Sequence, residues 1–171
     1  LQEAARAAFG TERKVLDIFY PMMRTRALPL IPGGLTIADV NEKSGRDTLA
    51  LVEAHGGRGL FVSADMGKAA DVKAVIERTR QAFGGLHMVS NNAALGAPNK
   101  PVTELNEQEW DRCMAVTLRG VWLCMKYQLP LIEASGGGAI VNVASVSGIR
   151  GEAYQSAYTA AKGGVIALSK T

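Results

Sequence analysis

"LTIADVNEKSGRDTLALVEAHGGRGLFVSAD" spans residues 35–65 and contains two short apolar runs separated by an amphipathic segment. The runs at 35–40 and 59–65 are predicted to be strands, and residues 41–55 a helix that ends at a pair of glycines. A strand, a crossover helix and a second strand in about 30 residues form the unit that builds parallel sheets. The stretch therefore predicts an α/β fold.

The same alternation continues along the chain. It predicts a helix at 68–83, strands at 86–90 and 139–144, and a long helix at about 106–134, with glycines after each of these helices. Repetition of this kind indicates a parallel sheet with helices on both faces. We assign residues 35–171 to one doubly wound, Rossmann-type α/β domain.

The composition is that of a globular protein, with 47% hydrophobic and 20% charged residues among 171. The net charge of +3 comes without a dense Lys/Arg cluster, so no nucleic-acid partner is implied. No apolar run approaches the roughly 18 residues of a membrane span. Cys113 and Cys124 are too far apart in one predicted helix for a disulfide, and no metal-ligand spacing occurs. Free thiols favour a reducing compartment, so we expect a cytoplasmic protein without a signal peptide.

Polar side chains follow four of the predicted strands, namely Asp39, Asp65, Asn91 and Ser145. In a doubly wound sheet, ligands bind outside the carboxyl ends of the strands. We therefore expect these residues to mark a binding site at one edge of the sheet. For Asp39 and Asp65 a role as a turn or helix-cap acid stays open.

Tyr158 and Lys162 lie one helical turn apart near the end of the chain, so their side chains share a face. A free tyrosine, with a pKa of about 10, is a poor base at neutral pH, and a nearby ammonium favours its phenolate form. Taken alone, the pair is better explained by an exposed turn of a helix than by a catalytic site. Its context favours chemistry, because Ser145 follows an apolar strand and small residues around both segments leave room for a flat ligand.

"AIVNVASVSG" (139–148) followed by "YTAAK" (158–162) closely resembles the active-site segment of the short-chain dehydrogenase/reductase family. Other stretches resemble motifs of that family in the right order: "IADV" (37–40), "ADM" (64–66) and "NNAA" (91–94). The resemblance implies an oxidoreductase that interconverts a secondary alcohol and a ketone by hydride transfer with a nicotinamide cofactor.

The resemblance also implies catalytic roles. Tyr158 would exchange a proton with the substrate oxygen, and Ser145 would hydrogen-bond that same oxygen. Lys162 would favour the tyrosinate and bind the nicotinamide ribose. Thr117 stands at the fourth catalytic position, where the family usually has an asparagine that supports a proton path, so we expect proton transfer along a reduced or rewired path rather than its loss.

For the cofactor, the resemblance places Asp39 on the adenosine ribose. A carboxylate binds a 2′-hydroxyl but repels a 2′-phosphate, so NAD is expected rather than NADP. The remaining residues expected to line the adenosine side are Asp65, Met66, Asn91 and Ala93.

Both ends of the chain depart from the family pattern. Residues 1–34 contain no G-x-x-x-G-x-G turn to hold a pyrophosphate, and we read them as an atypical segment in place of the usual first strand and turn. Within it, "RKVLDIFY" (13–20) could be a strand. Because the chain stops at Thr171, we expect the sheet to be incomplete.

These departures leave two alternatives to an active enzyme. One is an inactive fragment without a working pyrophosphate site. The other is an interaction module, because the helix at 106–134 is apolar nearly all round, which fits either a partner helix or a helix buried deep in this same domain. In either the enzyme or the module we expect a homo-oligomer formed through the helices at 106–134 and 155–171.

Overall fold

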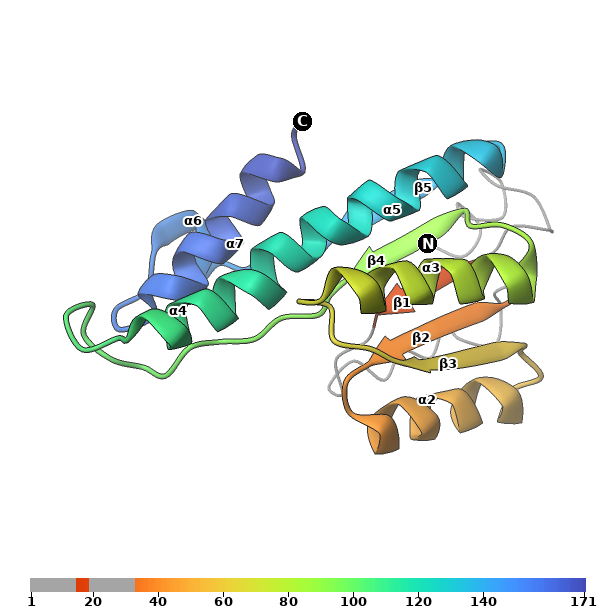
Figure 1. Ribbon diagram of the computed structural model, residues 1–171, viewed down its shortest axis with the longest axis horizontal. Helices are drawn as coiled ribbons and strands as arrows, with labels where there is room; N and C mark the ends of the chain where they lie inside the picture. Colours follow the sequence, from red (N-terminus) through yellow and green to blue (C-terminus); the bar gives the residue numbers. More distant parts are fainter. Residues whose placement is uncertain (1–14, 19–32) are drawn as a thin grey trace.

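The computed structural model describes residues 15–18 and 33–171, and in this part of the chain the strands form one parallel sheet (Figure 1). The sheet has five strands in the order β3-β2-β1-β4-β5. Their bounds are Val15–Ile18 (β1), Leu35–Asp39 (β2), Gly59–Ser63 (β3), Met88–Asn91 (β4) and Ala139–Asn142 (β5). The predicted α/β sheet of Rossmann type is confirmed.

The strand order places β1 at the centre. The chain builds outward from β1 to β2 and β3, then crosses to the other side of β1 for β4 and β5. Every neighbouring pair is parallel, and the register aligns Ile18 with Asn91 and Asn91 with Asn142. The order therefore reverses between β1 and β4, and a crevice is expected at the carboxyl ends of these strands.

The predicted strands are present, with shifted ends. β4 begins at Met88 rather than at residue 86. The reason is that the Leu86 N–H donates to Ser135 Oγ (2.9 Å), just past a helix, and not to a neighbouring strand. Sequence periodicity carries no information about such a partner, which lies almost fifty residues further on in the chain.

Helices cover both faces of the sheet, as predicted for a doubly wound fold. The helices in the described residues are α2 (Glu42–Ala54), α3 (Ala69–Phe83), α4 (Glu107–Met114), α5 (Gly120–Ala134), α6 (Ser147–Arg150) and α7 (Ser156–Leu168). α2 covers one face of the sheet, and α3 and α5 cover the other (Figure 1). Alternate residues of β2 point to opposite faces. Leu35 and Ile37 pack under α2 with Val52, whereas Ala38 belongs to the cluster under α3 and α5.

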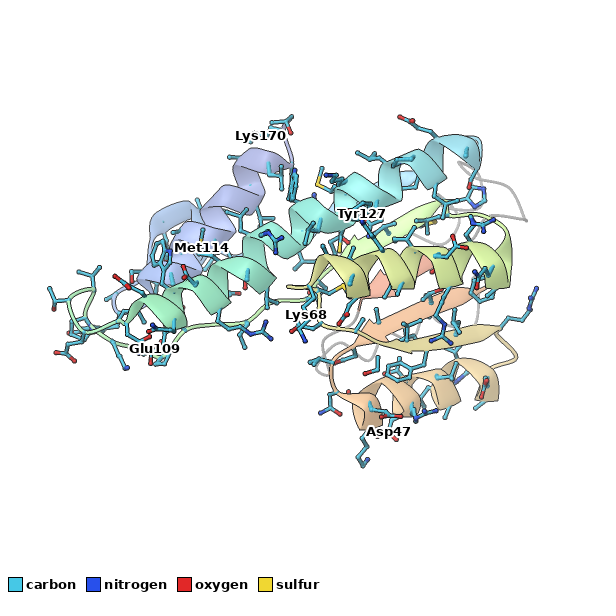
Figure 2. The ribbon with its side chains drawn as sticks, viewed as in Figure 1. Asp47, Lys68, Glu109, Met114, Tyr127 and Lys170 are labelled. Carbon is cyan, nitrogen blue, oxygen red and sulfur yellow. The ribbon has the colours of Figure 1, made fainter. Side chains whose placement is uncertain are left out.

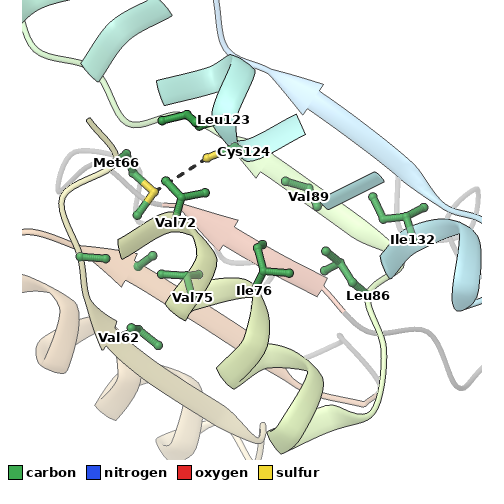
Figure 3. Close-up of a cluster of buried hydrophobic side chains, with 12 residues drawn as sticks. Val62, Met66, Val72, Val75, Ile76, Leu86, Val89, Leu123, Cys124 and Ile132 are labelled. Atoms are coloured by element: carbon green, nitrogen blue, oxygen red, sulfur yellow. Dashed lines mark hydrogen bonds between the residues drawn. The ribbon is translucent and has the colours of Figure 1, made fainter. Parts of the chain in front are cut away.

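The larger cluster is the main core and joins α3, α5, β3 and β4 (Figure 3). Val72, Val75 and Ile76 on α3 meet Leu123 and Cys124 on α5 above the sheet. Burial of an aliphatic side chain of this size contributes about 1.5 to 3 kcal/mol relative to exposure. Cys124 and Cys113 are buried free thiols, as the sequence predicts.

The long predicted helix is present but is not a regular α-helix. Between α4 and α5, residues Ala115–Arg119 (η2) form a π-helical turn. Gly120 follows it, and a Cβ there would lie 2.8 Å from Met66 O. The helix therefore passes against the turn after β3, an approach that only glycine permits. Arg119 Nη1 donates to Gly67 O (3.2 Å) at the same place.

α5 is buried on the side of α3 and exposed on the other. Trp122 and Leu129 are 44% and 42% exposed, and the Lys126 ammonium lies 5.1 Å from the Trp122 ring centroid. α4 packs against α7 through Cys113, with Met114 beside this contact (Figure 2). Oligomerisation through these helices stays a prediction.

The predictions for residues 1–34 can be compared with the structure only at residues 15–18 and 33–34. Residues 15–18, within the stretch 13–20 that could be a strand, form β1. Residues 1–14 and 19–32 lie outside the described residues, so the predictions of an atypical segment without a glycine-rich turn and of a chain without a signal peptide stay predictions. No helix among residues 33–171 is long and apolar enough to span a membrane.

Candidate active site

α7 and α6 hold the predicted catalytic pair in place. Ala157 and Ala161, both fully buried, let α7 lie close to Cys113 of α4. Gly148 of α6 touches the backbone of α7, since a Cβ on it would lie 2.6 Å from the Lys162 carbonyl carbon. The small residues of this segment therefore fix the helix that carries Tyr158 and Lys162.

Lys162 is 2% exposed, which is unusual for a lysine. Its ammonium donates to Val143 O, just past β5, and lies 5.8 Å from the centroid of the Tyr158 ring. Burial lowers the pKa of Lys162, and the nearby Cys113 opposes that shift. Among the described residues, one carbonyl oxygen accepts from an ammonium that has three donors.

A cavity of about 480 Å³ opens beside Tyr158 and Lys162. Its walls come from the loop after β4, the residues after β5 and the start of α7. They are Asn92, Ala94, Gly96, Ala97, Asn99, Val143, Ala144, Gln155, Tyr158 and Lys162. The cavity thus lies at the carboxyl ends of β4 and β5, next to the point between β1 and β4 where the strand order reverses.

Ser145 follows two cavity residues, Val143 and Ala144, but is not itself part of the wall. Its hydroxyl donates to Ser147 Oγ (3.2 Å) and accepts from the Ser147 N–H (3.2 Å). Tyr158 and Lys162 therefore face the cavity together, whereas the Ser145 hydroxyl is engaged beside it.

Thr117 is fully buried in the π-helical turn. Its hydroxyl accepts from the Leu95 N–H (2.9 Å) and donates to Leu95 O (2.8 Å). Because a hydroxyl has a single proton, Thr117 cannot donate elsewhere while it bonds Leu95. Thr117 therefore fixes the loop that forms one wall of the cavity, and a catalytic role for it stays a prediction.

Asp39 and Asp65 lie just after β2 and β3. The Asp39 carboxylate accepts from the Asn41 N–H (2.8 Å), which fixes it at the strand end. Asp65 pairs with Arg112 of α4 (2.9 Å) and accepts from the Gly67 N–H (2.9 Å). Burial raises the pKa of Asp65, but Arg112 and Gly67 outweigh it and hold the pKa below its usual range. The Arg112 partner was not predicted.

The structure brings Met66, Asn91 and Ala93 together around a cavity of about 10 Å³, which has room for about one water molecule. The Met66 side chain belongs to the core and contacts Cys124 (Sδ–Sγ 3.9 Å). These side chains therefore support the sheet, and any contact with a larger ligand falls to their backbone.

Asn91 is 2% exposed and its amide bonds other side chains. It donates to Gln128 Oε1 (3.1 Å) and to Asn142 Oδ1 (2.9 Å), and accepts from Gln128 Nε2 (2.9 Å). This network ties β4 to α5 and β5 beside the cavity. Gln128 was missed by sequence reading; a glutamine in an otherwise apolar helix is its only signal.

No group of three or more His, Cys, Asp and Glu side chains that could hold a metal ion occurs within residues 33–171. His87 interacts with Ser135 O (3.1 Å), and the exposed His55 with Leu51 O (2.8 Å).

A parallel sheet in the order 3-2-1-4-5, with a cavity at the carboxyl ends of its strands and a Tyr–Lys pair in its wall, defines an α/β domain of the Rossmann type. A family model described as short chain dehydrogenase matches residues 32–171. The chain belongs to this family.

Individual relatives of the chain belong to the same family. The chain is 40% identical over 152 residues to short chain dehydrogenase/reductase astE of Aspergillus oryzae, which covers 86% of this chain and 58% of that protein. It is 36% identical over 149 residues to cyclohexanol dehydrogenase of an Acinetobacter species, covering 86% and 59%. Among solved structures, a short chain dehydrogenase/reductase from Burkholderia phymatum in complex with NAD gives a TM-score of 0.83 at 26% identity, covering 95% and 59%. The chain thus spans less than two thirds of the length of these relatives.

Proposed function

We propose that this chain carries the proton-transfer site and cofactor side of a dehydrogenase that interconverts a secondary alcohol and a ketone. One observation carries the proposal: a buried lysine ammonium lies one helical turn from a tyrosine in the wall of a cavity at the strand ends. A lysine buried without a carboxylate partner is costly, which favours a functional role over a structural one.

The residues present fit a nicotinamide dinucleotide on the nicotinamide side. The Lys162 ammonium has donors to spare for ribose hydroxyl groups, and the adjoining cavity of about 480 Å³ suits a flat ring with its ribose. Asp39 would hold the adenosine ribose from the end of β2. The bound cofactor supplies the hydride acceptor or donor.

The chain's own residues handle the proton. Tyr158 takes the hydroxyl proton of an alcohol at its phenolate oxygen, or returns it to a ketone oxygen from its phenol. The Lys162 ammonium stabilises the negative charge on that phenolate. Ser145, once its hydroxyl turns to the cavity, would stabilise charge that develops on the substrate oxygen.

Cofactor-dependent turnover tests this function. We expect cyclohexanol, the substrate named for one relative, to drive formation of NADH, followed by its absorbance. NADH should also raise the melting temperature, since a ligand at 100 times its Kd adds about 2.7 kcal/mol to the unfolding free energy. A chain that shows neither a melting-temperature shift at millimolar NADH nor turnover with a range of secondary alcohols contradicts the proposal.

The expected cofactor is NAD rather than NADP, and Asp39 provides the test. Asp39→Asn keeps an acceptor for the Asn41 N–H but removes the charge that would repel a 2′-phosphate. Near a protein surface this repulsion is worth about 1 to 4 kcal/mol, so the NAD-to-NADP affinity ratio should fall about fivefold or more. Titration of both reduced cofactors by fluorescence measures it. Asp47→Asn, an exposed aspartate paired with Lys43 on α2, is the control. An unchanged ratio in Asp39→Asn excludes Asp39 as the selecting residue.

A further inference from the structure

Ser145 is the first member of a short hydrogen-bond chain that ends on a carboxylate. Ser145 Oγ donates to Ser147 Oγ (3.2 Å), and Ser147 Oγ donates to Glu152 Oε2 (2.6 Å). Ser147 is 4% exposed, whereas Glu152 lies at the surface. A buried hydroxyl therefore connects the predicted catalytic serine with a surface charge.

The Glu152 carboxylate determines which hydroxyl donates and which accepts in this hydrogen-bond chain. An ionised glutamate side chain can only accept hydrogen bonds, so the single Ser147 hydroxyl proton must lie toward Glu152. Ser147 Oγ can then only accept from Ser145. The Ser147 N–H also donates to Ser145 Oγ (3.2 Å), so two contacts hold the Ser145 hydroxyl with its proton toward Ser147. This orientation agrees with the absence of Ser145 from the cavity wall.

The backbone between α6 and α7 brings Glu152 back to Ser147. Gly151 adopts φ +76°, and Tyr154 is the one non-glycine residue with positive φ (62°) among those described. A tyrosine in this conformation costs of order 1 kcal/mol or more and persists only where the surroundings hold it. Here the Lys100 N–H donates to Tyr154 O (3.1 Å) and the Gln155 N–H to Glu152 O (3.3 Å). The turn that presents Glu152 is thus kept at an energetic cost.

We propose that Ser147 and Glu152 are positioning residues that set the direction of the Ser145 hydroxyl and thereby the preference of the site between an alcohol and a ketone. The proposal rests on the alcohol–ketone function proposed above. A ketone oxygen only accepts, so Ser145 must break its bond to Ser147 before it can donate to the ketone. An alcohol needs no proton from Ser145, because its own hydroxyl donates to the Tyr158 phenolate, and Ser145 can then stay bonded to Ser147. Glu152 therefore disfavours the ketone.

Glu152→Gln separates this role from a structural one. The amide has the same shape but carries N–H donors, so the chain can reverse and release the Ser145 proton for a ligand. The Kd of cyclohexanone for the NAD⁺-loaded protein should fall about threefold to tenfold, the effect of one hydrogen bond. The Kd of cyclohexanol for the NADH-loaded protein should stay the same or rise. These pairs do not react, so binding is read without turnover.

Two further variants complete the comparison. Ser147→Ala removes the acceptor of the Ser145 proton and should also tighten cyclohexanone. Glu133→Gln changes an exposed glutamate at the end of α5 and should alter neither affinity. Damage to the fold would weaken both ligands alike. Equal weakening of both ligands in Glu152→Gln, or no change in either, overturns the proposal. Failure of the wild-type protein to bind either ligand contradicts the proposed function instead.

Neutron diffraction from the free protein in D₂O locates the deuterons of the Ser145–Ser147–Glu152 hydrogen bonds without cofactor or substrate. We expect the Ser147 deuteron on the line to Glu152 and the Ser145 deuteron on the line to Ser147. A Ser147 deuteron directed at Ser145, or a Ser145 deuteron directed into the cavity, overturns the proposal even if the protein shows no turnover.

Discussion

Tyr158→Phe is expected to lower kcat/KM for alcohol oxidation by about 100- to 10,000-fold, the usual contribution of a positioned acid–base group. Phenylalanine keeps the ring that packs beside α4 and removes only the hydroxyl. Within the described part of the chain, that hydroxyl forms no hydrogen bond whose loss would unfold the protein. Steady-state kinetics with cyclohexanol measure the loss, and thermal unfolding shows whether the melting temperature stays within a few degrees.

Tyr154→Phe is the matched control. Tyr154 lies in the turn before α7, four residues before Tyr158, is 62% exposed, and contributes its backbone oxygen rather than its side chain to the Lys100 contact. The variant should keep the activity of the wild type. Substantial turnover in Tyr158→Phe, or equal losses in the two variants, would remove Tyr158 from the proton-transfer role.

The sheet and the Tyr–Lys pair could be predicted because the information is local. Buried parallel strands are short apolar runs, and their alternation with helices predicts parallel pairing, so β2 to β5 were found within a few residues. Tyr158 and Lys162 were placed together because i and i+4 share a helix face. The burial of Lys162 does not follow from this spacing, since an exposed helix turn has the same pattern.

What sequence reading missed depends on contacts between distant segments. Arg112 on α4 reaches Asp65 after β3, and Thr117 bonds the backbone of Leu95. Nothing in the local pattern of either residue indicates its partner. The π-helical turn at 115–119 was missed for the same reason, because an apolar period does not distinguish one wide turn from a regular one. Of these long-range contacts, the one between Thr117 and Leu95 holds the loop that forms part of the cavity wall.

Glu152 could not be predicted as part of the site, because it belongs to no recognised sequence motif. The sequence motif drew attention to Ser145, whereas nothing in the sequence distinguishes Glu152 from other acidic residues. Only the left-handed backbone at Gly151 returns it to Ser147. Sequence motifs therefore identify site residues that lie on regular helices and strands. They do not identify residues that an irregular turn places next to the site.

Lys162→Met is expected to lower kcat/KM by about 100-fold or more while raising the melting temperature. The loss of activity follows because no positive charge is left to stabilise the Tyr158 phenolate or to hold the ribose. The gain in stability follows because a buried ammonium with one carbonyl partner gives way to an apolar side chain of similar length. The gain is on the order of 1 kcal/mol, about 2 to 4 °C for a chain of this size. Val143 O, half-buried beside the cavity, can bond water instead.

The pH dependence of that gain identifies its origin. Burial lowers the pKa of Lys162 in the folded protein, whereas an unfolded lysine keeps a pKa of about 10.4. Between these two values the unfolded state binds more protons, so the stability of the wild type rises with pH. The advantage of Lys162→Met should therefore be largest at neutral pH and shrink as the pH rises toward about 10.4. Lys170→Met, at an exposed lysine near the C-terminus (Figure 2), should show no such trend. Thermal unfolding from pH 6 to 10 tests this. If the variant is less stable than the wild type at pH 7, or its advantage does not vary with pH, the Lys162 ammonium is not a source of strain in the fold, and its burial no longer argues for a catalytic site.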